Sequence, residues 1–272
     1  MVQSPTPLLS RYPSTELAES GWRIEVVAQP NGSTMHCQVP LTAAEFLHPQ
    51  EGYHLPNSTF HDDTAGDAKD ILTRRYASNP DVGVFRDLLL EWDLDLSDHC
   101  PDTFVAFGIR NKAENRSKFV VTDEGVRPLF ILEVVSPRYR KADRETKVVE
   151  YARARVQEYV IIDRRTYRGQ LLDEVLGYCL VEGFYQPITP DDEGRILCDT
   201  LGVWISLQDG RLVIEDAKTG QRLKTSLELE AANQELETAK NAAQQQAAEM
   251  AALLARYQEQ FGDLPEDNTR ET

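Results

Sequence analysis

Two carboxylates are the residues of this sequence whose types and positions most favour a chemical role. Glu133 lies inside the apolar run Leu129–Val135, which prolines bound, and such a run predicts a strand buried on both faces. A carboxylate inside a buried strand is costly unless it is paired, protonated or bound to a metal. Asp102 stands at the start of another predicted strand, Thr103–Ile109. If the two strands are neighbours, both carboxylates converge and bind a hard divalent cation; otherwise Asp102 caps a turn.

A lysine on the following predicted helix, Ala142–Arg155, is the third candidate. Lys147 comes four residues after Asp143, which places both on one helix face with Tyr151. The apolar face that begins at Val148 is a different one, so the pattern also allows Lys147 to be a solvent-facing partner of Asp143. The catalytic interpretation requires the helix to turn its lysine towards the buried carboxylate. An ammonium there would offset the charge that develops on a pentacovalent phosphate.

The elements around these residues predict an α/β fold. A second buried strand, Glu158–Asp163, follows the helix, and this order of elements forms a crossover unit. Upstream, residues 1–20 are expected to be a loose arm, followed by a hairpin over Trp22–Gln29 and Thr34–Val39. A longer helix is predicted over Asp62–Ala77. Downstream, short strands separated by turns predict an antiparallel extension of a mixed central sheet flanked by helices.

The last part of the chain predicts a long helix over about Ser226–Gln260, because it is rich in Ala, Glu and Gln and lacks Gly and Pro. Apolar residues recur there every seven positions, as in Leu229, Leu236 and Met250. The seam is rich in alanine and glutamine, so a dimerising coiled coil and a solitary or docked helix are both compatible with it. From Gly262 onwards we expect a disordered tail.

Composition argues against several classes of protein. The chain has 272 residues, of which 41% are apolar and 27% charged, as in ordinary soluble proteins. No apolar run approaches the ~20 residues of a membrane span, and no signal peptide is expected. Four isolated cysteines suit a reducing cytosol, and no P-loop or GxGxxG motif supports a nucleotide cofactor. The five histidines show no metal-ligand spacing, and His99 is interpreted as a loop residue.

The net charge of −16 argues against a surface that binds nucleic acid everywhere. Between Glu133 and Arg168, however, the sequence contains ten Lys or Arg residues and six Asp or Glu residues. The net charge of this window is therefore +4, and that of the rest of the chain is −20. A basic patch in an acidic protein engages phosphates at one place. A solvated helix face with i,i+4 ion pairs explains the same window equally well.

Four motifs in this order resemble the Uma-type (Uma two) family of restriction endonucleases, a branch of the PD-(D/E)XK nuclease superfamily. They are Cys-Pro-Asp102-Thr-Phe-Val, Glu133-Val-Val-Ser-Pro, Asp143-x-x-x-Lys147-x-x-x-Tyr151 and Glu158-Tyr-Val-Ile-Ile-Asp163. The resemblance covers about Thr42 to Asp209, and the ordered set is more specific than any single motif.

The resemblance implies that Asp102 and Glu133 ligate Mg²⁺, with Mn²⁺ as an alternative. The family's usual lysine would stand two residues after the second acid, where this chain has Val135. In this family its role appears on the next helix, which here offers Lys147. Arg155 stands where relatives tend to have glycine, and a non-glycine residue there would resist a left-handed conformation.

We therefore expect a restriction-endonuclease-like α/β fold and a magnesium-dependent endodeoxyribonuclease of the cytoplasm that acts on DNA as a homodimer, with no membrane and no nucleotide cofactor. The expected domains are an N-terminal arm and hairpin (1–41), the nuclease-like domain (42–222), a coiled-coil-like helix (223–261) and the tail (262–272). The main alternative is a catalytically inactive nuclease-fold protein that assembles through its C-terminal helix, and the sequence also leaves open a nuclease that acts on RNA or on branched DNA. The expected site residues are Asp102, Glu133 and Lys147 for catalysis, Asp143 and Tyr151 in support, and Arg138, Arg140 and Lys141 for flanking phosphates.

Overall fold

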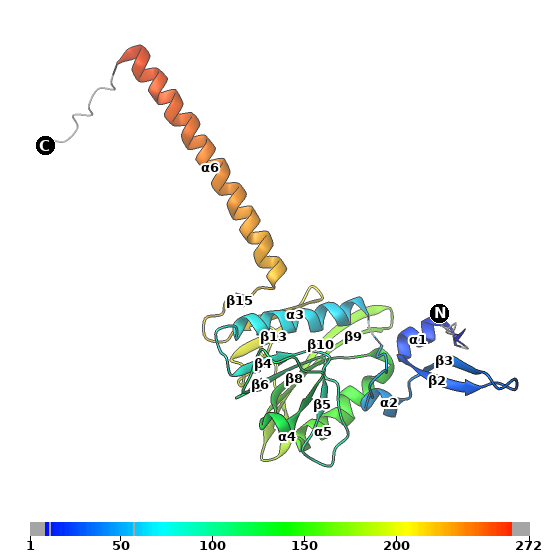
Figure 1. Cartoon of the computed structure of the whole chain (residues 1–272). Helices are drawn as coiled ribbons and strands as arrows, with labels where there is room; N and C mark the ends of the chain where they lie inside the picture. The colour runs from blue at the N-terminus through cyan, green and yellow to red at the C-terminus, as the bar shows by residue number, and fades with distance from the viewer. Residues whose placement is uncertain (1–8, 11, 57, 263–272) are drawn as a thin grey trace. The chain divides into compact units, whose positions relative to one another are not determined.

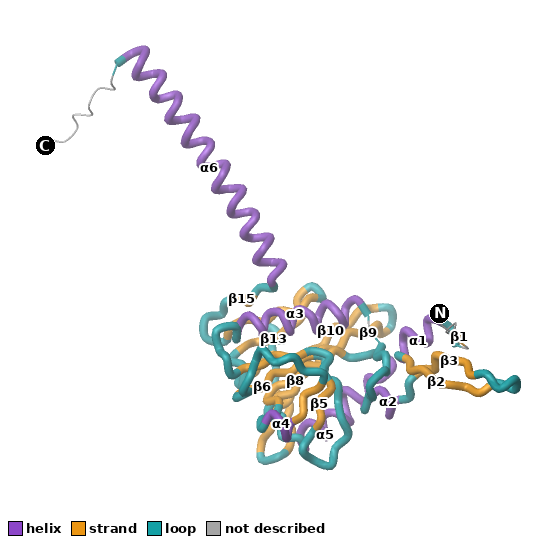
Figure 2. The backbone as a smooth tube through the Cα atoms, in the orientation of Figure 1, coloured by secondary structure: helices purple, strands orange, loops and turns teal. Residues whose placement is uncertain are grey.

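The computed structural model describes residues 9–10, 12–56 and 58–262 and divides the chain into two compact units, Met1–Leu223 and Lys224–Thr272. Figures 1 and 2 show layers of helices and strands in the first unit and one long helix in the second. The finer division at residues 41 and 222 stays a prediction. The predicted disordered tail falls almost entirely on residues 263–272, which lie outside the described part of the chain.

A six-stranded sheet forms the centre of the first unit, in the order β11-β10-β9-β8-β6-β4. β8 and β9 run parallel, and the other neighbouring pairs are antiparallel. The mixed central sheet predicted from the sequence is therefore confirmed. Its strands are β4 (Val82–Phe85), β6 (Thr103–Phe107), β8 (Pro128–Val134), β9 (Glu158–Tyr167), β10 (Gln170–Val181) and β11 (Phe184–Ile188).

Alternation along β8 decides which way its carboxylate points. Successive side chains of a strand face opposite sides of the sheet. Phe130 packs in the core that α3 (Thr59–Arg75) covers, whereas Ile131 packs in the core on the side of α5 (Lys147–Arg153). Figure 1 shows these two helices on opposite sides of the sheet. Glu133 has the same parity as Ile131, so it faces α5.

The segment between β8 and β9 contains three short helical pieces, where the sequence predicted one helix over 142–155. They are the 3-10 helix η1 (Pro137–Tyr139), the π-helix η2 (Ala142–Thr146) and α5. A π-helical turn is rare and is often found at functional sites. Arg155 follows α5 with a φ of 58°, so this arginine adopts the left-handed conformation that glycine would take more readily.

Two smaller sheets complete the layers. A four-stranded antiparallel sheet in the order β12-β13-β14-β15 packs with α3 in one core. A two-stranded parallel sheet of β5 and β7 lies in the core on the α5 side, beside α4. The elements are β5 (Leu89–Glu91), β7 (Lys118–Val120), α4 (Val121–Glu124), β12 (Ile196–Cys198), β13 (Val203–Gln208), β14 (Arg211–Asp216) and β15 (Arg222–Leu223).

The N-terminal residues are more ordered than the sequence predicted. Residues 14–20 form a helix that buries Leu17, so the expected loose arm over residues 1–20 is wrong for this part. The predicted hairpin is present, and a capping box between Thr42 and Glu45 starts the next helix. The elements are β1 (Leu9–Ser10), α1 (Ser14–Ser20), β2 (Trp22–Ala28), β3 (Thr34–Pro40) and α2 (Ala43–Leu47).

One strand was divided wrongly in the sequence-based prediction. Gly169–Leu172 and Gly177–Val181 were expected as separate strands, but β10 is continuous through Gly177. A Cβ atom at this glycine would lie 2.5 Å from the side chain of Ile196 in β12. The glycine therefore marks a close approach between two sheets, a role that resembles a turn signal when only the sequence is known.

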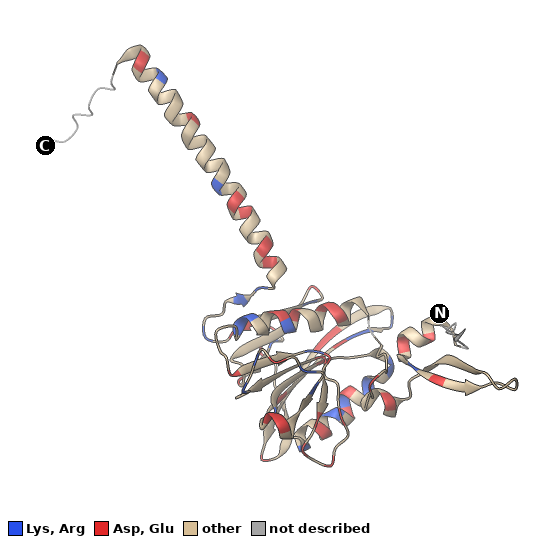
Figure 3. Cartoon of the chain, viewed as in Figure 1, with Lys and Arg blue, Asp and Glu red and all other residues tan. Residues whose placement is uncertain are grey.

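The second unit contains α6 (Ser226–Phe261), which begins at a capping box between Thr225 and Glu228. The predicted long C-terminal helix is thus confirmed, and none of its residues is buried within the described chain. The helix contains six glutamates and two basic residues. Figure 3 marks its acidic residues in red and its basic residues in blue. Among the residues that the structure describes, no helix is both long and apolar enough to cross a bilayer.

Candidate active site

Asp102 and Glu133 stand opposite each other on neighbouring strands. The register that pairs Thr103 with Leu132 places Asp102 opposite Glu133 one position further. Glu133 Oε2 accepts a hydrogen bond from the Asp102 backbone N–H at 3.4 Å, and Asp102 Oδ2 accepts one from the Val134 N–H at 2.6 Å. The two residues are only 6% and 2% exposed. The structure therefore brings together the two acids that the sequence singled out.

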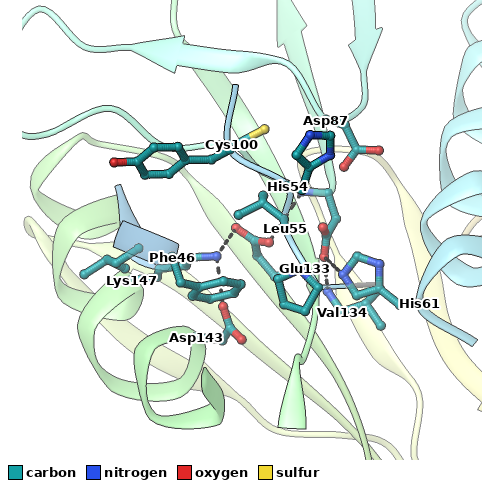
Figure 4. A pocket seen from close by; sticks show the side chains of 14 residues that line it. Phe46, His54, Leu55, His61, Asp87, Cys100, Glu133, Val134, Asp143 and Lys147 are labelled. Carbon is teal, nitrogen blue, oxygen red and sulfur yellow. Dashed lines mark hydrogen bonds and ion pairs between the residues drawn. The ribbon is translucent and has the colours of Figure 1, made fainter. Parts of the chain in front are cut away.

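Lys147 lies on the buried face of α5, with its ammonium between two carboxylates. Its Nζ donates to Glu133 Oε1 at 3.0 Å and lies 2.9 Å from Asp143 Oδ1, as Figure 4 shows. The Tyr151 hydroxyl donates to the same Glu133 oxygen at 2.7 Å. Lys147 is 4% exposed, whereas Val149 is 59% exposed. The alternative of a solvent-facing lysine is therefore wrong, because the helix buries its lysine face.

The electrostatics of this cluster keep the lysine charged and one acid partly neutral. Burial raises the pKa of Glu133 to about 8, with Asp102 and Asp143 adding to the rise and Lys147 opposing it. Burial also disfavours ionisation of Asp102, but nearby cations, His61 first among them, hold its pKa below the usual value. The pKa of Lys147 is raised, because Asp143 and Glu133 outweigh its burial.

A cavity of about 320 Å³ opens above these residues. Four carboxyl groups line it, against a single lysine, so a divalent cation would balance their charge. Carboxylate oxygens are the donors that Mg²⁺ and Mn²⁺ prefer, and the donor set fits such an ion. The lining residues are Phe46, Leu47, Tyr53, His54, Leu55, Pro56, His61, Asp87, Cys100, Asp102, Glu133, Val134, Asp143 and Lys147.

Two of these lining residues were missed in the sequence. His61 Nε2 lies 3.2 Å from Asp102 Oδ2, and its Nδ1 is buried without a hydrogen-bond partner among the described residues. The sequence predicted that the helix begins at Asp62, whereas Ser58 caps it and His61 lies in its first turn. Asp87 has a left-handed backbone with a φ of 49°, a strained conformation that often occurs at functional sites.

A protein-family model described as "Putative restriction endonuclease" matches residues 54–208, more than half of the chain. The chain belongs to the Uma2 family. The family resemblance seen in the ordered motifs is thereby confirmed. The matched range of this Uma2 protein includes His61, Asp102, Glu133 and Lys147, and it leaves out residues 46–53 of the cavity wall.

Among solved structures, the Uma2 chain is similar to a putative nuclease belonging to DUF820 from Anabaena variabilis ATCC 29413. The two are 14% identical, and the similarity covers 60% of this chain and 91% of that chain, with a TM-score of 0.41. A comparison with curated proteins gave no match. The chemistry of the site therefore follows from the side chains of this Uma2 chain itself.

A second cluster in the Uma2 chain has the residue types of a metal site, but the hydrogen bonds of its buried histidine argue against a bound metal. His48, His99 and Glu150 bring three ligand-type atoms within 4.8 Å of one another, although the sequence shows no ligand spacing. The Trp92 indole N–H, which can only donate, gives its hydrogen bond to His99 Nδ1 at 2.9 Å. The proton of this neutral imidazole is then on Nε2, which donates to Glu150 at 2.8 Å. Because Nδ1 must accept from Trp92, a metal on Nε2 would leave neither ring nitrogen protonated, which makes the imidazole an anion, so the cluster does not fit an ion.

The three predicted phosphate contacts of the Uma2 chain differ in their availability. Arg140 is paired with the buried Asp163 at 2.6 Å, which neutralises part of the basic patch. Lys141 is largely exposed and lies 3.8 Å from Glu145. Arg138 is exposed and lines a second cavity beside the first. Lys141 and Arg138 therefore have more accessible side chains than Arg140.

Proposed function

We propose that this chain is a metal-dependent nuclease that hydrolyses phosphodiester bonds of DNA. The observation that carries this proposal is the opposed pair Asp102 and Glu133, with the Lys147 ammonium bound to the second carboxylate. The two acids would hold Mg²⁺ or Mn²⁺. Such an ion, when bound, polarises the phosphate and makes a bound water more acidic.

The chain's own side chains would then perform distinct tasks. Lys147 carries a fixed positive charge beside the reacting phosphate and stabilises the negative charge that develops on it. Asp143 and Tyr151 position this lysine and the Glu133 carboxylate through the contacts described above. Arg138 and Lys141, with Arg140 in a lesser part, contact flanking phosphates and set the position of the strand.

The proposal is tested by cleavage of a supercoiled plasmid and of a circular single-stranded DNA by the purified wild-type chain. We expect cleavage of at least one of them with Mg²⁺ or Mn²⁺ and no cleavage with EDTA, because a metal-free site lacks the Lewis acid. The fraction of nicked plasmid and of linear single strand on agarose gels measures the result. A chain that cleaves nothing under any divalent ion would instead be the non-catalytic interaction protein, an alternative that Val135 in the usual lysine position favours.

We also propose that the chain forms a homodimer through α6. Leu236, Met250 and Leu253 are exposed along this helix, and an isolated apolar stripe is stabilised when a second helix covers it. Deleting residues 226–272 should leave the first unit folded, because α6 buries no side chain. We expect the full chain to show twice its monomer mass by light scattering and the shortened chain to show its own monomer mass. Equal oligomeric states would contradict the dimer.

A cytoplasmic location completes the proposal. All four cysteines, Cys37, Cys100, Cys179 and Cys198, are free thiols. Free thiols persist in the reducing cytoplasm, where DNA is also accessible to a nuclease.

A further inference from the structure

One segment forms much of the wall of the catalytic-site cavity. Residues 46–56, which we call the roof segment, comprise the end of α2 and most of the segment that links it to α3, and most of them precede the range matched by the family model. Figure 4 shows Phe46, His54 and Leu55 of this segment around the carboxylates. Six of the fourteen lining residues belong to it: Phe46, Leu47, Tyr53, His54, Leu55 and Pro56.

The roof segment is held in place at both ends. Phe46 stacks on Tyr139 with ring centroids 4.1 Å apart. His54 and Trp22 exchange two backbone hydrogen bonds of 2.8 Å, and their rings stack at 3.8 Å. Gly21 permits this approach, because a Cβ atom there would collide with the His54 carbonyl. The roof segment is therefore packed as part of the folded domain, and in this structure it covers the site.

A covered site restricts the form of nucleic acid that reaches the carboxylates. Asp102, Glu133 and Lys147 are almost inaccessible, and the cavity of about 320 Å³ is at the small end of the ~300–1,000 Å³ range of ligand pockets. Duplex DNA is stiff over ~50 nm and would have to bring both strands to the cavity together. An unpaired strand bends at each nucleotide, so it can insert a single nucleotide into the cavity. We propose that the substrate of this site is unpaired DNA, an inference that rests on the proposed nuclease function.

The chemistry along the cavity suits a single strand. Tyr53 is a half-buried aromatic residue of the roof, and aromatic rings bind unpaired bases by stacking, whatever the sequence. A neighbouring cavity of about 540 Å³ shares Pro56 and His61 with the first one. Arg138 lines this second cavity and offers a cation to the next phosphate of the strand. His61 thus borders both cavities, and the strand would run from the carboxylates past His61 to Arg138.

Binding without cleavage tests this inference separately from catalysis. The wild-type chain, with Ca²⁺ in place of Mg²⁺ to balance the carboxylates and at fixed salt, is titrated into a fluorescent 20-nucleotide DNA strand or the same strand in a duplex; anisotropy is recorded, and a gel checks that the DNA stays intact. We expect the single strand to bind at least about tenfold more tightly. Tyr53→Ala should weaken single-strand binding by about tenfold, the lower part of the range for one stacked base, and Tyr53→Phe should restore it. His36→Ala, an exposed change on β3, is the matched control.

Three results would overturn the inference. Equal or tighter binding of the duplex would show that the roof admits paired strands. Unchanged single-strand binding by Tyr53→Ala would remove the stacking surface from the path. Absence of binding to either form would overturn the substrate assignment as well. If the wild-type chain still nicks plasmid with a divalent ion in any of these cases, the proposed nuclease function stands and only the unpaired substrate is refuted.

Discussion

Replacing Lys147 by alanine is expected to lower the rate of DNA cleavage by about 10²–10³, because it removes a fixed cation that contacts Glu133. The same change should also destabilise the fold. Removing one partner of a buried ion pair typically costs about 3–5 kcal/mol, since the remaining charges are left uncompensated. For a domain of this size, that loss corresponds to a fall in melting temperature of roughly 6–20 °C. Plasmid nicking and thermal unfolding measure the two effects.

A charge-matched variant separates the two contributions. Lys147→Met combined with Asp143→Asn removes the ammonium and the carboxylate that it pairs with at 2.9 Å, and it keeps similar volumes, so it should recover much of the lost stability while remaining inactive. Lys218→Ala, at an exposed turn, should behave as wild type in both assays. An active Lys147→Ala would leave the nuclease in place and exclude this lysine from its mechanism. An unchanged melting temperature would contradict the buried ion pair.

Glu133 should make the protein less stable as the pH rises from about 4.5 to about 8. Its pKa is raised from 4.5 to about 8 in the folded chain by burial, Asp102 and Asp143. Over this interval the folded state keeps a proton that the unfolded state releases, so the free energy of unfolding falls as the pH increases. At ~1.4 kcal/mol per pKa unit, the loss is roughly 3–5 kcal/mol. Chemical unfolding of wild type and Glu133→Gln at several pH values measures it.

The Glu133→Gln variant is the control for this pH dependence of stability. Glu133→Gln cannot ionise, so the difference in stability between the two proteins should shrink or reverse in favour of the variant as the pH increases from about 4.5 to about 8, and level off above that. Because a bound cation needs the ionised carboxylate, Mn²⁺ should stabilise wild type more at pH 8 than at pH 6 and release a proton on binding. Parallel pH profiles for the two proteins would show that Glu133 ionises normally.

The sequence by itself determined the elements whose signals are local. The apolar runs of β8 and β9, the crossover between them, the capping boxes at Thr42 and Thr225, and the long α6 each depend on residues a few positions apart. Hydrophobic alternation and capping act over one or two turns or strand repeats, so the sequence displays them directly. The same locality made Glu133 stand out, because one acid interrupts an apolar strand.

Only the tertiary structure decided which distant residues share the site. The register of β6 against β8 places Asp102 opposite Glu133, and the packing of α5 turns Lys147 inwards instead of towards solvent. His61 and the roof segment lie more than 40 residues before Asp102 in the sequence, and no local pattern links them to it. Their proximity depends on long-range packing. Close packing of the whole core determines which helix and strand faces lie against each other, and no short stretch of sequence specifies this.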